Sequence, residues 1–210
     1  MKFSNYSLLF LLATSASHGA FVISQPNEPT AQGNAGTGQS FTPSVGMVDD
    51  PGPSTSTIDL TGFSLWSSGG ASATTGRNTT YLLIYDANPS GTANLVGSST
   101  NFIDLDPISN APAGTQLTWT FNNLTLNFNT TYFAVISSSD AGTTVNDIGV
   151  GFRNSTSNPY AGGNALADNF AVQGTGDLKF TATFANPVPE PAAALLGSIG
   201  ILTLLRRRRG

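Results

Sequence analysis

The stretch Thr79–Asp86, which reads TTYLLIYD, decides the fold class of this chain. Side chains of an extended strand alternate between two faces. One face of this stretch therefore takes Leu82 and Ile84, and the other takes Tyr81, Leu83 and Tyr85. Both faces are apolar, which is typical of a strand in the middle of a covered sheet.

Alternation of apolar and polar residues recurs between residues 21 and 184. The apolar residues Ile58 and Leu60 occupy even positions, whereas Phe63 and Leu65 occupy odd ones. This change in the phase of the alternation at Gly62 predicts a β-bulge. The same pattern predicts further strands at Leu117–Phe121, Leu124–Phe128, Thr131–Ser137, Ile148–Phe152, Phe170–Val172 and Leu178–Phe184. The expected buried side chains are Leu82, Ile84, Trp119, Phe121, Phe133, Val135 and Phe180.

Turn-forming residues separate the predicted strands, as in Asp49–Pro53, Ser67–Asn78, Asn88–Gly91, Asn110–Gly114, Ser138–Thr143 and Asn154–Gly163. No helical periodicity interrupts them. We therefore predict an all-β fold, an antiparallel jelly-roll-like β-sandwich over residues 21–184. Residues 22–40 are polar and are expected to be irregular.

The composition excludes several kinds of chemistry. The chain of 210 residues has no cysteine, so disulfides, thiolate metal sites and cysteine nucleophiles are absent. Its single histidine, His18, lies in a segment that we expect to be removed. Residues 21–191 hold all 12 acidic residues but only Arg77, Arg153 and Lys179 as bases, which gives this segment a charge of −9. We therefore expect no binding of nucleic acid.

The N-terminal residues 1–20 have the order of a secretory signal peptide. Lys2 supplies the positive end, Leu8–Ala13 the short apolar run, and small residues precede a cleavage site near Ala20. Cleavage after Gly19 is an alternative. The pattern predicts export, with the Sec translocation machinery as a partner.

The C-terminal residues have three parts in a fixed order. A proline-rich linker, residues 185–191, precedes an uncharged apolar run, residues 192–205, and the run ends in Arg206, Arg207, Arg208 and Arg209. As a helix, these 14 residues would cover about 21 Å. Snorkelling arginine side chains extend such a short span, and arginines favour the cytoplasmic side. We therefore predict a short C-terminal transmembrane helix. A core helix with a basic end is the alternative.

This order resembles the PEP-CTERM sorting signal over about 24 residues, with the motif in the linker 185–191 and the hydrophobic helix and Arg cluster in residues 192–210. Val188, Pro189, Glu190 and Pro191 match its VPEP form, and Arg206–Arg209 match its terminal cluster. The resemblance implies a Gram-negative bacterium that makes exopolysaccharide, and processing by an exosortase, an integral-membrane transpeptidase-like enzyme, around Pro189–Pro191. It also implies an inner-membrane intermediate that is later released or transferred to the cell surface or extracellular matrix.

The body is similar to the choice-of-anchor domains, extracellular β-sandwiches that precede such anchors. Gln39-Ser40-Phe41-Thr42, Tyr81–Asp86 and Leu126–Phe133 carry this likeness. The family offers no catalytic residues that could be assigned here.

The sequence offers candidate residues for three kinds of site. A polysaccharide hydrolase would need two carboxylates, for which Asp104 and Asp106 are the closest pair, although Pro107 after them favours a strand end. Calcium is a possible cofactor, with oxygen ligands from Asp49, Asp50, Asp86, Asn88, Asp104 and Asp106. Asp and Asn are also common in ordinary turns, which is the alternative interpretation.

A glycan could stack on an exposed aromatic ring. Trp66 is out of phase with Leu65 and is expected to face solvent, and Tyr160 lies in a turn-rich loop. Trp119 is in phase with Leu117 and Phe121 and is expected in the core.

The prediction for the whole protein is a non-catalytic, exported and surface-sorted component of the cell envelope or exopolysaccharide matrix. A carbohydrate-binding module is the second hypothesis, and an Asp-dependent polysaccharide hydrolase is the third.

Overall fold

The computed structural model describes residues 20–26, 38–44, 47–48, 56–67, 79–104, 114–137, 152, 154–155, 159–167, 170–172 and 176–185. The predicted signal peptide up to residue 19, the linker from residue 186 and the sorting segment lie outside the described residues. So do Asp49, Asp50, Asp106 and all but Phe152 of the strand predicted at Ile148–Phe152.

The described residues form antiparallel β-sheets, as predicted, and contain no α-helix. One sheet has the order β3-β1-β13-β4-β8, and the second has the order β11-β2-β9-β5-β6, with β7 also pairing with β5. β10 and β12 form a short pair. The strands are β1 (Phe21–Gln25), β2 (Gly38–Phe41), β3 (Met47–Val48), β4 (Thr57–Trp66), β5 (Thr79–Tyr85), β6 (Leu95–Ser98), β7 (Ile103–Asp104), β8 (Gln116–Asn127), β9 (Tyr132–Ser137), β10 (Asn154–Ser155), β11 (Ala165–Leu166), β12 (Asp177–Leu178) and β13 (Phe180–Ala185).

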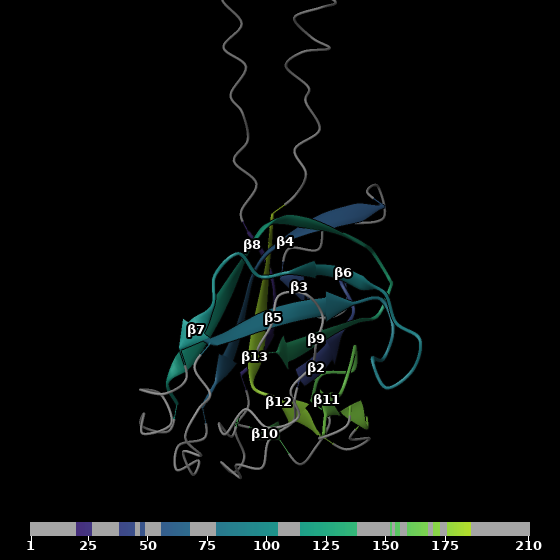
Figure 1. Ribbon diagram of the computed structural model, residues 1–210. Coiled ribbons are helices and arrows are strands. Elements are labelled where there is room, and N and C mark those ends of the chain that lie inside the picture. Colours follow the sequence, from purple (N-terminus) through teal and green to yellow (C-terminus); the bar gives the residue numbers. More distant parts are fainter. Residues whose placement is uncertain are drawn as a thin grey trace, which may run out of the picture.

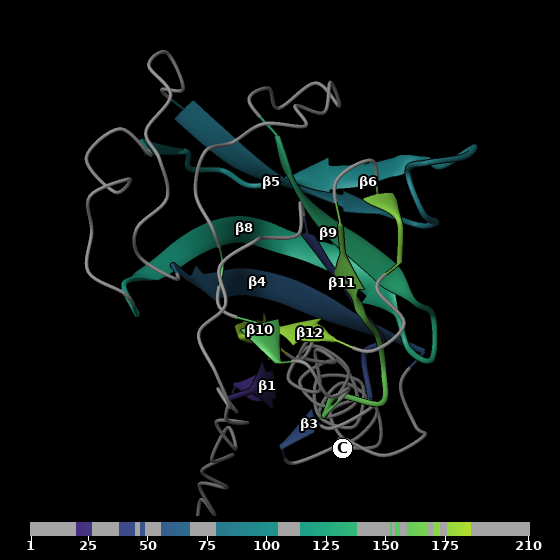
Figure 2. The same cartoon turned by 90° about the horizontal axis from the view of Figure 1, so that it is seen from below.

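The two larger sheets face each other across one apolar core, which gives a β-sandwich-like fold (Figures 1 and 2). Trp119 on β8 is completely buried, and its Nε1–H donates to the Thr80 carbonyl oxygen on β5 at 3.1 Å. Phe63 on β4 stacks against Phe180 on β13, with ring centroids 5.5 Å apart. The inward faces of both sheets thus supply the core, as alternation predicts.

Strand β5 is apolar on both faces for the reason that its sequence indicates. Leu82 and Ile84 point into the core between the sheets. Leu83 and Tyr85 join a second cluster on the outer face, together with Leu166 and Phe170. β5 also has neighbours on both edges, β9 on one side and β6 and β7 on the other. The prediction of a central strand is confirmed.

The phase slip at Gly62 corresponds to a double irregularity. Thr61 is an extra residue of β4 relative to β13, and its hydroxyl donates to the Thr183 carbonyl oxygen at 3.1 Å. On the other side of β4, the three residues Phe121–Asn123 of β8 lie opposite Thr61 alone. Asn123 has a φ of 50°, in the left-handed region that Asn tolerates better than most residues.

These bulges keep both long strands amphipathic. The inward residues of β8 change from Trp119 and Phe121 to Leu124 and Leu126 across the irregularity, and those of β4 change from Leu60 to Phe63. A regular strand would have turned half of these side chains to solvent.

Three predictions of local structure were wrong. Phe133 is only partly buried, because it lies on the outer face of β9 beside the second cluster. Phe170–Val172 is no strand; Phe170 has a φ of 60°, and Val172 makes only an isolated bridge to Leu166. The stretch 22–40, expected to be irregular, contains most of β1 and the first three residues of β2.

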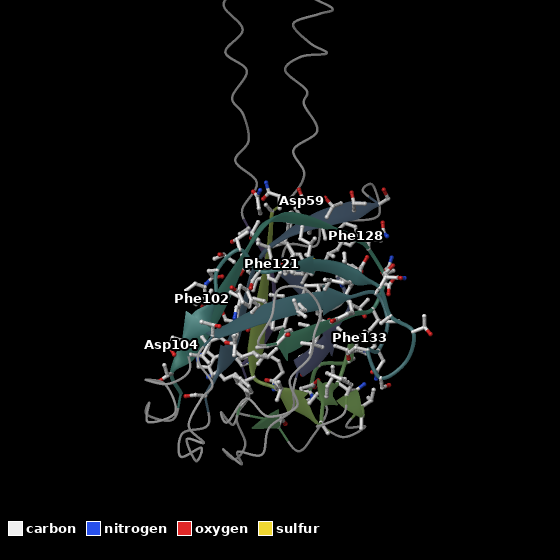
Figure 3. The ribbon with its side chains drawn as sticks, viewed as in Figure 1. Asp59, Phe102, Asp104, Phe121, Phe128 and Phe133 are labelled. Carbon is white, nitrogen blue, oxygen red and sulfur yellow. The ribbon has the colours of Figure 1, made fainter. Side chains whose placement is uncertain are left out.

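The sandwich has two distinct ends. Phe21 at the start of β1 pairs with Phe184 near the end of β13, so the first and last described strands meet at one end, here called the exit end. Asp59 pairs with Ala185 at this end, whereas Asp104 lies at the opposite end (Figure 3). Asp59 lies near the start of β4 and Trp66 is its last residue, so Trp66 lies at the far end of the sheet from Asp59.

The free edge of β8 is capped by a neighbouring segment. The Asn101 side chain accepts a hydrogen bond from the Thr120 backbone N–H at 2.7 Å and donates to the Thr118 carbonyl oxygen at 3.1 Å. The Thr100 N–H donates to the Thr120 carbonyl oxygen at 2.8 Å. Exposed edges promote pairing between molecules, so this cap protects a 12-residue edge strand.

Replacing Asn101 with Ala should destabilise the protein and expose this edge. We expect a loss of about 1–2 kcal/mol in unfolding free energy, because two backbone groups of β8 lose their partner, together with concentration-dependent aggregation. Chemical unfolding and light scattering measure the two effects. Asn122→Ala, on the same strand, is the control and should be nearly neutral. Equal behaviour of the two variants would show that Asn101 does not protect the edge.

Candidate functional site

Trp66 is an aromatic side chain that the fold presents on the outward face of the five-stranded sheet. It is the last residue of β4, where Leu65 and Ser67 on either side are buried, and it is itself partly exposed. The Lys179 Nζ lies 4.9 Å from the centroid of its ring. An ammonium group over an indole is attracted by the ring's negative face, which holds the ring in one orientation.

Tyr160 does not share this exposure. Its side chain is only 5% exposed, and its ring packs edge-on against Phe180 with centroids 5.2 Å apart. Its hydroxyl donates to the Thr42 carbonyl oxygen and accepts from the Thr42 N–H, both at 3.0 Å. The expectation of an accessible ring at Tyr160 is therefore corrected, because the loop folds its aromatic residue under itself. Burial raises the pKa of Tyr160 to about 12.

A buried polar network joins Tyr160 to two strands. Asp177 is fully buried, and its carboxylate accepts hydrogen bonds from Gln39 Nε2 and from the Tyr160 N–H, both at 2.9 Å. The Gln39 Oε1 accepts from the Leu178 N–H at 2.8 Å. Desolvation raises the pKa of Asp177, against the lowering effect of the Tyr160 and Gln39 hydrogen bonds.

Sequence reasoning missed this network. In the sequence, Gln39 is notable only as part of a family resemblance, and no local pattern marks Asp177. The two residues are 138 positions apart in the chain, so their contact leaves no local signal. The network ties β2, β12 and the Tyr160 loop together. Its role in the described residues is to hold the fold.

Of the predicted calcium ligands that the structure describes, Asp86 and Asn88 make hydrogen bonds to other groups of the protein. Both Asp86 carboxylate oxygens accept hydrogen bonds from Asn94, one from the backbone N–H and one from the side chain, at 2.8 Å each. These bonds lower the pKa of Asp86. Asn88 accepts from the Ser90 N–H and donates to the Phe170 carbonyl oxygen. Asp104 lies on β7, paired with Thr79.

Within the ranges that the structure describes, no three acidic or histidine side chains gather where they could hold a metal ion. None of the described residues forms a helix long and apolar enough to cross a membrane.

The comparisons with known proteins give no relative. No family model, no curated protein and no solved structure matches this chain.

Proposed function

We propose that this protein is an exported, surface-sorted and non-catalytic β-sandwich protein of the cell envelope or exopolysaccharide matrix, processed by an exosortase. The proposal rests first on the two sequence signals at the ends of the chain. The structural observation that supports it is the pairing of Phe21 with Phe184.

This pairing joins both signals to the same end of the body. A leader that ends near Ala20 and a sorting segment that begins after Ala185 both connect at the exit end. The six residues from Asn186 to Pro191 span at most about 21 Å when fully extended. Before processing, the exit end would therefore lie close to the membrane surface, with Trp66 at the end that points away.

We propose further that the body is a jelly roll, flanked by a signal peptide and a short C-terminal transmembrane helix. The strand orders β1-β13-β4-β8 and β2-β9-β5-β6 support this topology. Along the chain, β1, β4, β8 and β13 belong to one sheet, and the strands that alternate with them, β2, the β5–β6 pair and β9, belong to the other. Repeated crossing between two sheets is the pattern of a double Greek key.

Carbohydrate binding is the second candidate function, and Trp66 is the observation that favours it. Its ring is partly exposed, is fixed by Lys179 and lies at the end of the sheet opposite the exit end. A matrix protein with such a ring would contact polysaccharide by the part of the body that is farthest from the membrane.

The sorting proposal predicts that the mature protein lacks both ends. Mass spectrometry of the protein from an exopolysaccharide-producing host should find no peptide that contains Arg206–Arg209. Glu190→Ala should leave a membrane-held precursor, because it changes the motif that the exosortase recognises. Asp59→Ala, at the exit end but outside the motif, is the control and should be processed normally. A mature surface form that keeps its terminal arginines would contradict exosortase processing.

A further inference from the structure

We propose that the outward face of the five-stranded sheet, at and beside Trp66, binds a neutral polysaccharide chain. This inference deepens the proposed function and rests on it. Four features of this face, here called the Trp66 face, carry the argument.

The first feature is a ring that is already in place. Trp66 extends outward from β4, and the ammonium of Lys179, the residue between β12 and β13, lies 4.9 Å from the centroid of its ring. An ordered ring loses little rotational freedom when a ligand stacks on it, so binding costs less entropy than it would for a mobile side chain. Indole rings have a large apolar surface that suits the C–H face of a sugar.

The second feature is a row of hydroxyl groups that crosses four strands. Register places one hydroxyl residue on each of β1, β13, β4 and β8, and they are Ser24, Thr181, Ser64 and Thr118. Ser24 and Thr118 are exposed and Thr181 is partly exposed, whereas Ser64 is buried. Neighbouring strands are about 4.8 Å apart, so the row is regular. Hydroxyls can both donate and accept, as sugar hydroxyls do.

Hydrogen bonds within this row hold its side chains. Ser24 and Thr181 are 3.2 Å apart, and Ser64 and Thr118 are 2.8 Å apart, measured between hydroxyl oxygens. Gln116, which pairs with Trp66, donates to the Ser64 hydroxyl at 3.0 Å. The row therefore connects directly to the position of the ring.

The third feature is the bare centre of the next row. That row carries Thr183, Gly62 and Thr120 on β13, β4 and β8. A Cβ at Gly62 would meet only the Thr183 Cβ and the Trp119 carbonyl oxygen, both at 3.8 Å, which is ordinary contact. Packing does not require glycine there, and glycine weakens a strand. Its effect is to leave the face low on the side of the hydroxyl row that is away from the ring.

The fourth feature is charge. The residues of both rows are uncharged, and within the part of the chain that the structure describes the Lys179 ammonium lies over the Trp66 ring. The segment 21–191 as a whole has a charge of −9. Anionic polymers are repelled by such a body, whereas a neutral chain is not. The net negative charge of the segment, set against the single ammonium at the ring, therefore favours neutral polysaccharides over uronate-rich ones.

The test is native affinity electrophoresis of the protein as purified from an exopolysaccharide-producing host in a zwitterionic detergent. Gels contain hydroxyethyl cellulose, galactomannan or dextran as neutral probes, and alginate or polygalacturonate as acidic ones. We expect retardation by at least one neutral probe, and at least a tenfold weaker apparent affinity for Trp66→Ala and for Gly62→Val. The second variant adds bulk to the face, while valine suits a strand.

Phe102→Ala is the matched control, because Phe102 is an aromatic residue that is 56% exposed elsewhere on the body. It should bind like the wild type, and circular dichroism should show that all variants are folded. No retardation by any neutral probe, retardation by acidic probes only, or unchanged binding by Trp66→Ala and Gly62→Val would overturn the inference.

Sorting is measured on the same variants by the loss of Arg206–Arg209. If the variants are processed normally but the wild type binds no neutral probe, the inference alone fails. If the wild type keeps its terminal arginines, the proposed sorting fails, whatever the gels show.

Discussion

Replacing Gly38 with Ala is expected to destabilise the protein by at least about 3 kcal/mol, or to prevent folding. Gly38 lies on β2 between β9 and β11. A Cβ at this position would overlap the carbonyl oxygen of Ala134 on the neighbouring strand. Backbone atoms within a sheet cannot move aside as a flexible side chain could, so β2 would separate from β9.

Gly62→Ala is the control for this prediction. Gly62 is also in a strand, but the added Cβ would lie 3.8 Å from its nearest neighbours. We expect this variant to be neutral or up to about 1 kcal/mol more stable, because alanine reduces the entropy of the unfolded chain. Chemical unfolding followed by circular dichroism distinguishes the two. A Gly38→Ala protein that unfolds like the wild type would show that β2 can shift relative to β9.

The contrast between these glycines explains what sequence could predict about the fold. Gly62 was recognised because it sits at a local change of phase, between Leu60 and Phe63. The demand on Gly38 comes from Ala134, almost one hundred residues later, and nothing near Gly38 signals it. Alternation is a local property, so the all-β class, the central β5 and the buried Trp119 followed from it.

The errors have the same origin. Tyr160 lies in a segment rich in Gly, Asn and Pro, which correctly indicates a loop but not the direction of the ring. Its burial depends on Phe180 and Thr42, far away in the chain. Phe133 follows its strand's alternation, but the extent to which an outer face is covered depends on the segment around Phe170.

The candidate site was predictable only in part. The outward position of Trp66 follows from the phase of β4, and the side chain that was expected to face solvent is partly exposed. The partner of that ring, Lys179, and the hydroxyl row beside it depend on which strands are neighbours. Strand order is set by tertiary packing, so sequence alone could not assemble the face.

Asp177→Ala is expected to destabilise the protein by about 3 kcal/mol near neutral pH. The substitution removes the carboxylate that accepts hydrogen bonds from Gln39 Nε2 and from the Tyr160 N–H, both at 2.9 Å. These two buried donors then lose that acceptor, which costs free energy. Asp177→Asn retains one acceptor oxygen but places an amide N–H₂ against a donor. It should therefore be less damaging than alanine, at about 1–2 kcal/mol.

The sign of the pH dependence distinguishes this carboxylate from a surface one. Burial raises the pKa of Asp177 in the folded protein above its value of 3.8 in the unfolded chain. Between those two pKa values the folded state binds the proton more tightly, so this group's contribution to stability falls as pH rises through the window. Asp86 has a lowered pKa and acts oppositely, since its contribution is lost as pH falls below about 4.

Comparison of variants isolates the contribution of Asp177. The stability of the wild type relative to Asp177→Asn should be greatest near the unfolded pKa and should decline as pH rises towards neutrality, because asparagine does not titrate. Asp86→Asn should show the reverse trend, with its deficit greatest at neutral pH and smallest in acid. Unfolding free energies from chemical denaturation at a series of pH values provide the measurement. A wild-type advantage over Asp177→Asn that grows with pH would mean that hydrogen bonding from Gln39 and Tyr160 outweighs desolvation of the carboxylate, and that the network favours a charged Asp177.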